Sequence, residues 1–211
     1  MNDSRKLLLK VLILSIVLNG IDVLIQWITV SPWGEEGLLL IPMILIFPLL
    51  ISLILIPVSL ITAIFKRVRQ ISLIWLYSSL LYFCVGILLF KAGGFVRMQA
   101  FNGLAERSTV LVEAIHNYDK DNGQPPKSLA DLVPRYVPDI PKTRIGAYPE
   151  YRYELVTDLK KWDENPWVLY VDTPIGMLNW DMFLYFPKQN YPLHGYGGYL
   201  ERVKDWAYVH E

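Results

Sequence analysis

The chain has 211 residues, of which 53% are hydrophobic, and its 20 Lys and Arg residues balance 20 Asp and Glu residues. This neutrality argues against nucleic-acid binding, which needs a basic surface. The single cysteine, Cys84, excludes a disulfide within the chain and any cysteine-based metal cluster. Because the hydrophobic residues are concentrated before Lys91, we expect the two parts of the chain to lie in different solvents.

Three apolar runs in the first part are long enough to cross a bilayer as helices. They cover residues 11–30, 38–65 and 71–90, and about 20 helical residues span the hydrocarbon core. Pro42, Pro48 and Pro57 fall in the second run and predict a tilted or kinked helix. The sequence therefore predicts a three-helix transmembrane region over residues 1–92 and a second domain over residues 93–211.

Basic residues set the expected orientation of these helices. They precede the first run and occupy the connection between the second and third runs, at Arg5, Lys6, Lys10, Lys66, Arg67 and Arg69. The other connection, residues 31–36, carries Glu35 and Glu36 and no Lys or Arg. The positive-inside rule then predicts a multi-pass protein of the inner membrane, with a cytoplasmic N-terminus and an extracytoplasmic C-terminal domain.

A polar stripe runs along the first predicted helix. Asn19, Asp22 and Gln26 follow Ser15 at helical spacing, so the four side chains share one face. A carboxyl group inside a membrane is a candidate for a proton or ion relay. The alternative, which we favour, is that these side chains hydrogen-bond to neighbouring helices and hold the bundle together.

The part after Lys91 changes from helical to strand periodicity. Apolar residues at helical spacing predict a helix from Phe95 to Tyr118, ended by Asn122-Gly123, and joined to the third span through Gly93-Gly94. A short turn of helix capped by Ser128 and Asp131 is expected next. Alternation then predicts strands at residues 151–155, 167–171, 182–186 and 206–209. The expected fold is α+β, a long helix packed on a small antiparallel meander.

One segment of this domain carries a family resemblance. The residues are Leu111 to Tyr118, then Asp121-Asn122-Gly123, Pro126 to Leu129 and Leu132-Val133-Pro134. This pattern resembles the globular part of type II secretion pseudopilins and type IV pilin-like proteins, best over residues 105–153. The resemblance implies a long helix packed on an antiparallel sheet. It also implies a role in envelope secretion or pilus-like assembly, with protein partners or self-association.

No catalytic signature appears, so we expect a protein that is not an enzyme. The three histidines have no metal-ligand spacing, and no nucleophile motif is present. No cofactor is predicted. Calcium is left as an alternative, because loop carboxylates could supply oxygen ligands: Asp158, Asp163, Glu164, Asp172 and Asp181.

Aromatic residues provide the remaining candidate site. Tyr191, His194, Tyr196 and Tyr199 form a tyrosine-rich loop, and the domain also holds Trp162, Trp167, Trp180 and Trp206. Exposed rings would bind envelope glycans or a protein partner. The alternative is that the sheet uses these rings for its own core. Our first hypothesis is a structural or protein-interaction role, ahead of a glycan sensor and of a relay at Asp22.

Overall fold

The chain forms two compact units in a computed structural model, which describes residues 3–176 and 179–210. The helical unit consists of Met1–Ile28 and Leu38–Arg97. The second unit, here called the β-domain, consists of Thr29–Gly37 and Met98–Glu211. The connection between the first two helices therefore belongs to the β-domain and not to the helices that it joins.

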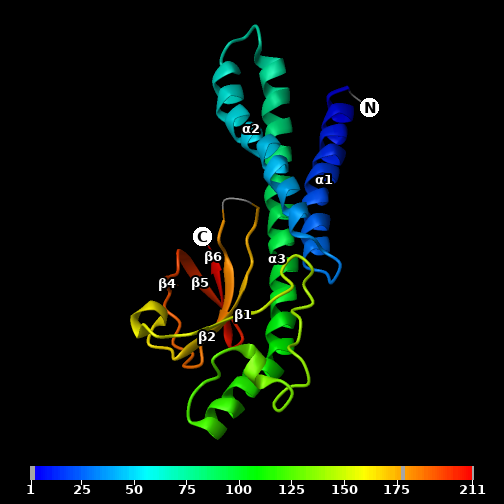
Figure 1. The fold of residues 1–211 in the computed structure, drawn as a ribbon. Coiled ribbons are helices and arrows are strands. Elements are labelled where there is room, and N and C mark those ends of the chain that lie inside the picture. Colours follow the sequence, from blue (N-terminus) through cyan, green and yellow to red (C-terminus); the bar gives the residue numbers. More distant parts are fainter. Residues whose placement is uncertain (1–2, 177–178, 211) are drawn as a thin grey trace. The chain divides into compact units, whose positions relative to one another are not determined.

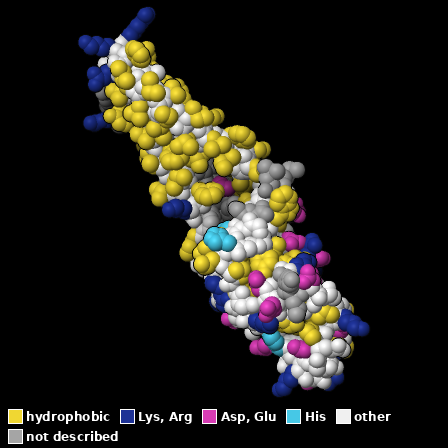
Figure 2. All heavy atoms as spheres, turned by 90° about the vertical axis from the view of Figure 1, so that its left-hand side faces the viewer, with side chains coloured by type: hydrophobic (Ala, Val, Ile, Leu, Met, Phe, Trp, Pro, Cys, Tyr) yellow, Lys and Arg dark blue, Asp and Glu magenta, His cyan; other side chains and the backbone are white. Residues whose placement is uncertain are grey.

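Three long helices carry the apolar runs. They are α1 (Asp3–Thr29), α2 (Leu40–Thr62, after the 3₁₀ turn Glu36–Leu39) and α3 (Arg69–Asn122) (Figure 1). Each is long and apolar enough to cross a membrane. Large hydrophobic side chains cover the surface of these helices, and Lys and Arg side chains gather at one end (Figure 2). Such a surface is expected where a lipid tail, and not water, is the solvent.

The third helix is continuous through Gly93-Gly94. Two adjacent glycines predict a flexible joint between the third span and the next helix, and that prediction is wrong. A glycine inside a helix lowers the stability of the helix by about 1 kcal/mol relative to alanine. A Cβ at Gly93 would lie 3.3 Å from Cγ of Gln26, and one at Gly86 would lie 3.2 Å from Oδ1 of Asn19. These glycines let α1 approach α3 closely. The close packing of α1 against α3 explains why glycine occurs at these positions. Gly123, with φ of +71°, follows the last helical residue as predicted.

The sheet of the β-domain is antiparallel and has six strands in the order β1-β2-β3-β6-β5-β4. The four predicted strands correspond to β1 (Arg152–Leu155), β2 (Trp167–Asp172), β3 (Met182–Tyr185) and β6 (Trp206–His210). Two strands were not predicted, β4 (His194–Gly195) and β5 (Gly198–Val203). The sheet is consequently two three-stranded meanders joined side by side by the β3–β6 pairing, and not a single meander.

One face of the sheet packs against α3. Phe101 is fully buried, and its ring lies 5.0 Å from that of Phe183 and 4.9 Å from that of Tyr208. Further along the helix, the His116 ring meets Trp167 edge-on at 5.3 Å. The helix presents its buried residues at helical spacing, which explains why one stripe of α3 covers this face: Phe101, Leu104, Leu111 and Ile115.

The opposite face of the sheet is covered by connections and not by a helix. Strand residues alternate between the two faces, so Val168, Leu184 and Val209 point away from α3. They form a second core with Trp162 and with Phe186, on which residues of the 186–196 connection pack. The domain thus buries both faces of its sheet without a disulfide.

Phe101→Ala should destabilise the β-domain strongly, because it removes a fully buried ring between α3 and the sheet. Buried Phe→Ala changes cost about 3–5 kcal/mol. The check is thermal unfolding of the detergent-solubilised chain, followed by the circular dichroism of the aromatic cluster. Val110→Ala is the control, since Val110 lies on the same helix and is 59% exposed. Equal melting temperatures for the two variants would contradict this packing.

Candidate functional site

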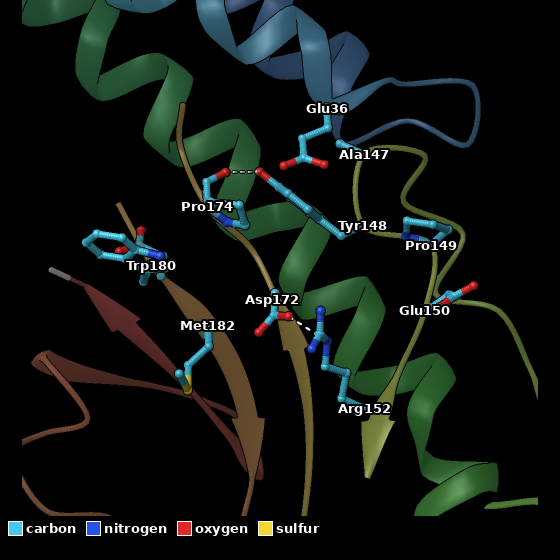
Figure 3. Close-up of a pocket in the computed structure, with 11 residues that line it drawn as sticks. Glu36, Ala147, Tyr148, Pro149, Glu150, Arg152, Asp172, Pro174, Trp180 and Met182 are labelled. Atoms are coloured by element: carbon cyan, nitrogen blue, oxygen red, sulfur yellow. Dashed lines mark hydrogen bonds and ion pairs between the residues drawn. The ribbon is translucent and has the colours of Figure 1, made fainter. Parts of the chain in front are cut away.

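A pocket of about 430 Å³ opens at one edge of the sheet in the β-domain. It is formed by three segments that are far apart in the sequence: the α1–α2 connection, the approach to β1, and the β2–β3 connection with its flanking strand ends. Trp180 lies on one side of it and Glu150 on the other (Figure 3). The lining residues are Glu36, Ala147, Tyr148, Pro149, Glu150, Arg152, Asp172, Pro174, Trp180, Asp181 and Met182.

Carboxylates dominate the charge of this pocket. Of its charged lining residues, only Arg152 is basic, and its Nε lies 2.6 Å from Oδ2 of Asp172. Asp181 is buried and accepts hydrogen bonds from the Tyr208 hydroxyl and from Nδ2 of Asn179, the latter at 2.7 Å. Glu36 and Glu150 are exposed. The pocket therefore presents an excess of negative charge beside the Trp180 indole, which is 70% exposed.

The α1–α2 connection is bound to the rest of the β-domain by main-chain contacts. Gly146 N–H donates to the Ser31 carbonyl at 2.8 Å, and Ala147 N–H donates to the Thr29 carbonyl at 3.3 Å. A Cβ at Gly146 would lie 2.2 Å from the carbonyl oxygen of Gly34, so only glycine allows the two backbones this close. This contact places Glu36, close to Gly34 in the sequence, beside the pocket.

Residues 143–148, which contact the α1–α2 connection, are hydrogen-bonded to α3 and to the β2–β3 connection. Arg107 on α3 donates from Nη2 to the Thr143 carbonyl at 3.0 Å, and the Thr143 hydroxyl donates to the Tyr148 carbonyl at 2.5 Å. The Tyr148 hydroxyl then donates to the Pro174 carbonyl at 2.7 Å (Figure 3). The pocket wall is consequently tied both to α3 and to the β2–β3 connection.

The polar stripe of α1 faces α3 within the helical unit. Asn19 donates from Nδ2 to the Ser15 carbonyl at 2.8 Å and lies against Gly86. The side chains of Asp22 and Gln26 are hydrogen-bonded to each other, and both lie against Gly93. These residues therefore lie close to α3. Both the hydrogen bonds to neighbouring helices that we favoured for them and their use as a relay stay predictions.

The tyrosine-rich loop does not present its rings as one surface. Tyr191 stacks on Phe186 at 4.9 Å, and Tyr196 stacks on Trp162 at 4.9 Å. Both rings pack on the second core. His194 and Tyr199 are exposed and pair across β4 and β5. Of the aromatic residues singled out from the sequence, Trp180 is the one that the fold brings to the pocket, together with Asp172 and Asp181 of the suggested calcium ligands.

The other pocket residues were missed because no sequence motif joins them. Glu36, Tyr148 and Arg152 come from separate segments, and their proximity depends on how the connection docks. The contact between Gly34 and Gly146 joins two of these segments, but no pattern in a single sequence indicates it. The remaining suggested calcium ligands, Asp158, Asp163 and Glu164, lie in the β1–β2 connection.

Gly146→Ala should displace the α1–α2 connection, because its methyl group would overlap the Gly34 backbone. We expect the amide of Ala147 to exchange its hydrogen at least about tenfold faster, as its bond to Thr29 opens. Hydrogen–deuterium exchange with mass spectrometry of the full chain measures this. Gly37→Ala, in the same connection but with nothing within 4 Å of the added Cβ, should leave exchange unchanged. Equal exchange in both variants would contradict the contact.

Burial raises the pKa of Tyr191, although hydrogen bonding from the Phe186 amide partly opposes the shift. The neutral phenol therefore stabilises the fold below about pH 10, and this contribution is lost as the pH rises through the raised pKa. The difference in tyrosinate absorbance between wild type and Tyr191→Phe should appear only at pH values above those at which exposed tyrosines ionise. In denaturant the same difference should appear near pH 10. Identical titrations in the two conditions would be inconsistent with a buried phenol.

The pocket and the docked connection are the two features of the β-domain that bear most on function. The pocket offers carboxylates and an indole to a ligand, and one of its lining residues, Glu36, comes from the α1–α2 connection. Among the described residues, no group of three or more His, Cys, Asp or Glu side chains is arranged to hold a metal ion. Comparisons with protein-family models, curated proteins and solved structures gave no match.

Proposed function

We propose that this chain is a non-enzymatic protein of the inner membrane whose β-domain, on the extracytoplasmic side, binds a basic segment of a partner protein in the pocket. The charge imbalance of the pocket carries the proposal. The pocket is lined by one basic side chain, that of Arg152, and by four acidic ones: Glu36, Glu150, Asp172 and Asp181. A lysine or arginine side chain would pair with the exposed carboxylates and stack on Trp180, which combines charge pairing with a cation–π contact.

The proposed orientation is supported by two independent features. The basic residues lie before α1 and in the connection between α2 and α3, which the positive-inside rule assigns to the cytoplasm. The α1–α2 connection lies at the opposite ends of those helices, and Gly146 and Ala147 bond to it. A connection bound to the β-domain must lie on the same side of the membrane as that domain.

The pilin-like resemblance supports an assembly role for the partner. Residues 105–153 carry the helix, turn and capped segment on which it rests, and α3 packs on an antiparallel sheet as the resemblance implied. The turn around Ser128 has its expected cap, because Ser128 N–H donates to Oδ2 of Asp131 at 2.9 Å. We therefore propose a component of a secretion or pilus-like assembly as the partner.

Reversing two exposed carboxylates should abolish the attraction for a basic peptide. We expect Glu36→Lys combined with Glu150→Lys to weaken binding of a fluorescent tetralysine peptide by at least about tenfold, or 1.4 kcal/mol. Binding to the full chain in nanodiscs is measured by fluorescence anisotropy at low and high salt. Glu113→Lys, a charge reversal at an exposed position of α3, should have little effect. Equal loss in both variants would indicate a general charge effect and contradict a pocket.

The partner itself is tested in intact cells. A photo-crosslinking amino acid at Met182, in the pocket, should give crosslinks to secretion or pilus-like components that the paired Glu36→Lys and Glu150→Lys changes remove. The same crosslinker at Glu113 should not give these products. Crosslinks from Met182 only to other copies of the chain would replace the proposed partner with self-association.

A further inference from the structure

A second cavity lies in the β-domain, between α3 and the turn that joins β5 to β6. Its volume is about 220 Å³. None of its lining residues lines the pocket described above, so the two sites are separate. It is called here the α3 cavity, and its lining residues are Ala105, Glu106, Thr109, Val112, Tyr185, Lys204, Asp205 and Trp206.

The apolar part of the α3 cavity is rigid. Four of its lining residues are buried and are aliphatic or aromatic: Ala105, Val112, Tyr185 and Trp206. The Trp206 ring is fixed by two neighbours, since it stacks on the Phe183 ring at 5.0 Å and lies 5.5 Å from the Tyr185 ring. A ligand that enters the cavity therefore meets a preformed apolar surface, which favours an apolar group of matching size.

Charged side chains line the exposed part of the cavity. Glu106 of α3 and Lys204 of the β5–β6 turn are exposed and form an ion pair. Asp205 adds a second carboxylate. The hydrogen bond from the Lys204 ammonium and the charge of that group lower the pKa of Glu106, so both partners are charged at neutral pH. The cavity thus offers one ammonium and two carboxylates beside an apolar surface.

The turn that carries Lys204 is held in place through its main chain. The Lys204 carbonyl accepts a hydrogen bond from Nη2 of Arg202 at 3.1 Å, and the Asp205 carbonyl accepts one from the Tyr191 hydroxyl at 2.7 Å. Lys204 has a φ of +57°, which is uncommon for a residue other than glycine. Such conformations cluster at ligand sites. The Lys204 ammonium is therefore positioned at the cavity before any ligand binds.

These groups match the chemistry of one class of small molecule. A free α-amino acid carries a carboxylate and an ammonium on the same carbon, and its side chain is free to contact an apolar surface. Its carboxylate would pair with Lys204 and its ammonium with Glu106, so that two charge-assisted contacts replace one exposed ion pair. A simple cation would leave Lys204 without a partner, and a simple anion would leave Glu106 without one. The volume is below the range of about 300–1,000 Å³ that holds drug-sized ligands, which suits a single amino acid.

We propose that the α3 cavity binds a free α-amino acid with an apolar side chain, with Lys204 as the partner of its carboxylate and Glu106 as the partner of its ammonium. This site adds a small-molecule ligand to the β-domain. It does not depend on the peptide pocket, because the two share no lining residue.

The test is equilibrium dialysis of radiolabelled L-leucine against the full chain in nanodiscs. Wild type should bind leucine saturably. Lys204→Met and Glu106→Gln should each weaken binding at least about tenfold, because each leaves one charged group of the ligand unpaired. Glu106→Gln keeps the size of its side chain and leaves the turn unchanged, so it guards against a disturbed turn in Lys204→Met. Lys188→Met is the matched control, since Lys188 forms an exposed ion pair with Glu164 away from the cavity, and it should bind as wild type does.

Two analogues of leucine test the charge assignment on the wild-type protein. 3-Methylbutylamine lacks the carboxylate and 4-methylpentanoate lacks the ammonium, and each should compete at least about tenfold more weakly than leucine. Equal competition by the amine would overturn the role of Lys204, and equal competition by the carboxylate would overturn that of Glu106.

The remaining outcomes decide whether the site exists. A wild type without saturable leucine binding would overturn the proposal, and so would equal binding by wild type, Lys204→Met and Glu106→Gln. The paired changes Glu36→Lys and Glu150→Lys should leave leucine binding unchanged while they remove peptide binding. Loss of leucine binding in that variant would place the ligand in the peptide pocket and contradict a separate site.

Discussion

The structure depends on the packing of one helix, α3, whose two halves meet different surroundings. The first half of α3 carries apolar side chains around its whole circumference. In the second half, the buried apolar side chains form a single stripe that includes Phe101, Leu111 and Ile115. Because the helix is continuous, the stripe on which the sheet forms is covalently fixed to a candidate span. The sheet buries its inner face on that stripe, and so the β-domain has a core although it lacks disulfides.

The second constraint is the close contact between Gly34 and Gly146. It joins the α1–α2 connection to the β-domain through main-chain hydrogen bonds, which depend little on side-chain identity. The pocket exists in its present form because of this contact, since Glu36 reaches it from the connection.

Buried and exposed aromatic residues have separate uses in this domain. Trp162, Trp167 and Trp206 fill the two cores, and Tyr191 and Tyr196 extend the second of them. Trp180 alone among the aromatic residues of the pocket is largely exposed, next to an ion pair between Arg152 and Asp172 that faces solvent. Such an exposed pair contributes little to stability.

The sequence by itself determined the three apolar helices, the end of α3 at Asn122-Gly123 and four strands, because each follows from local periodicity and capping. It did not determine β4 and β5. β4 has only two residues, and Gly197 and Tyr196 need positive φ values that make this stretch look like a loop. Nor did it determine the pocket or which aromatic rings are exposed. Those depend on contacts between distant segments, Gly34 with Gly146 and Tyr148 with Pro174, which local pattern does not encode and only the tertiary structure decided.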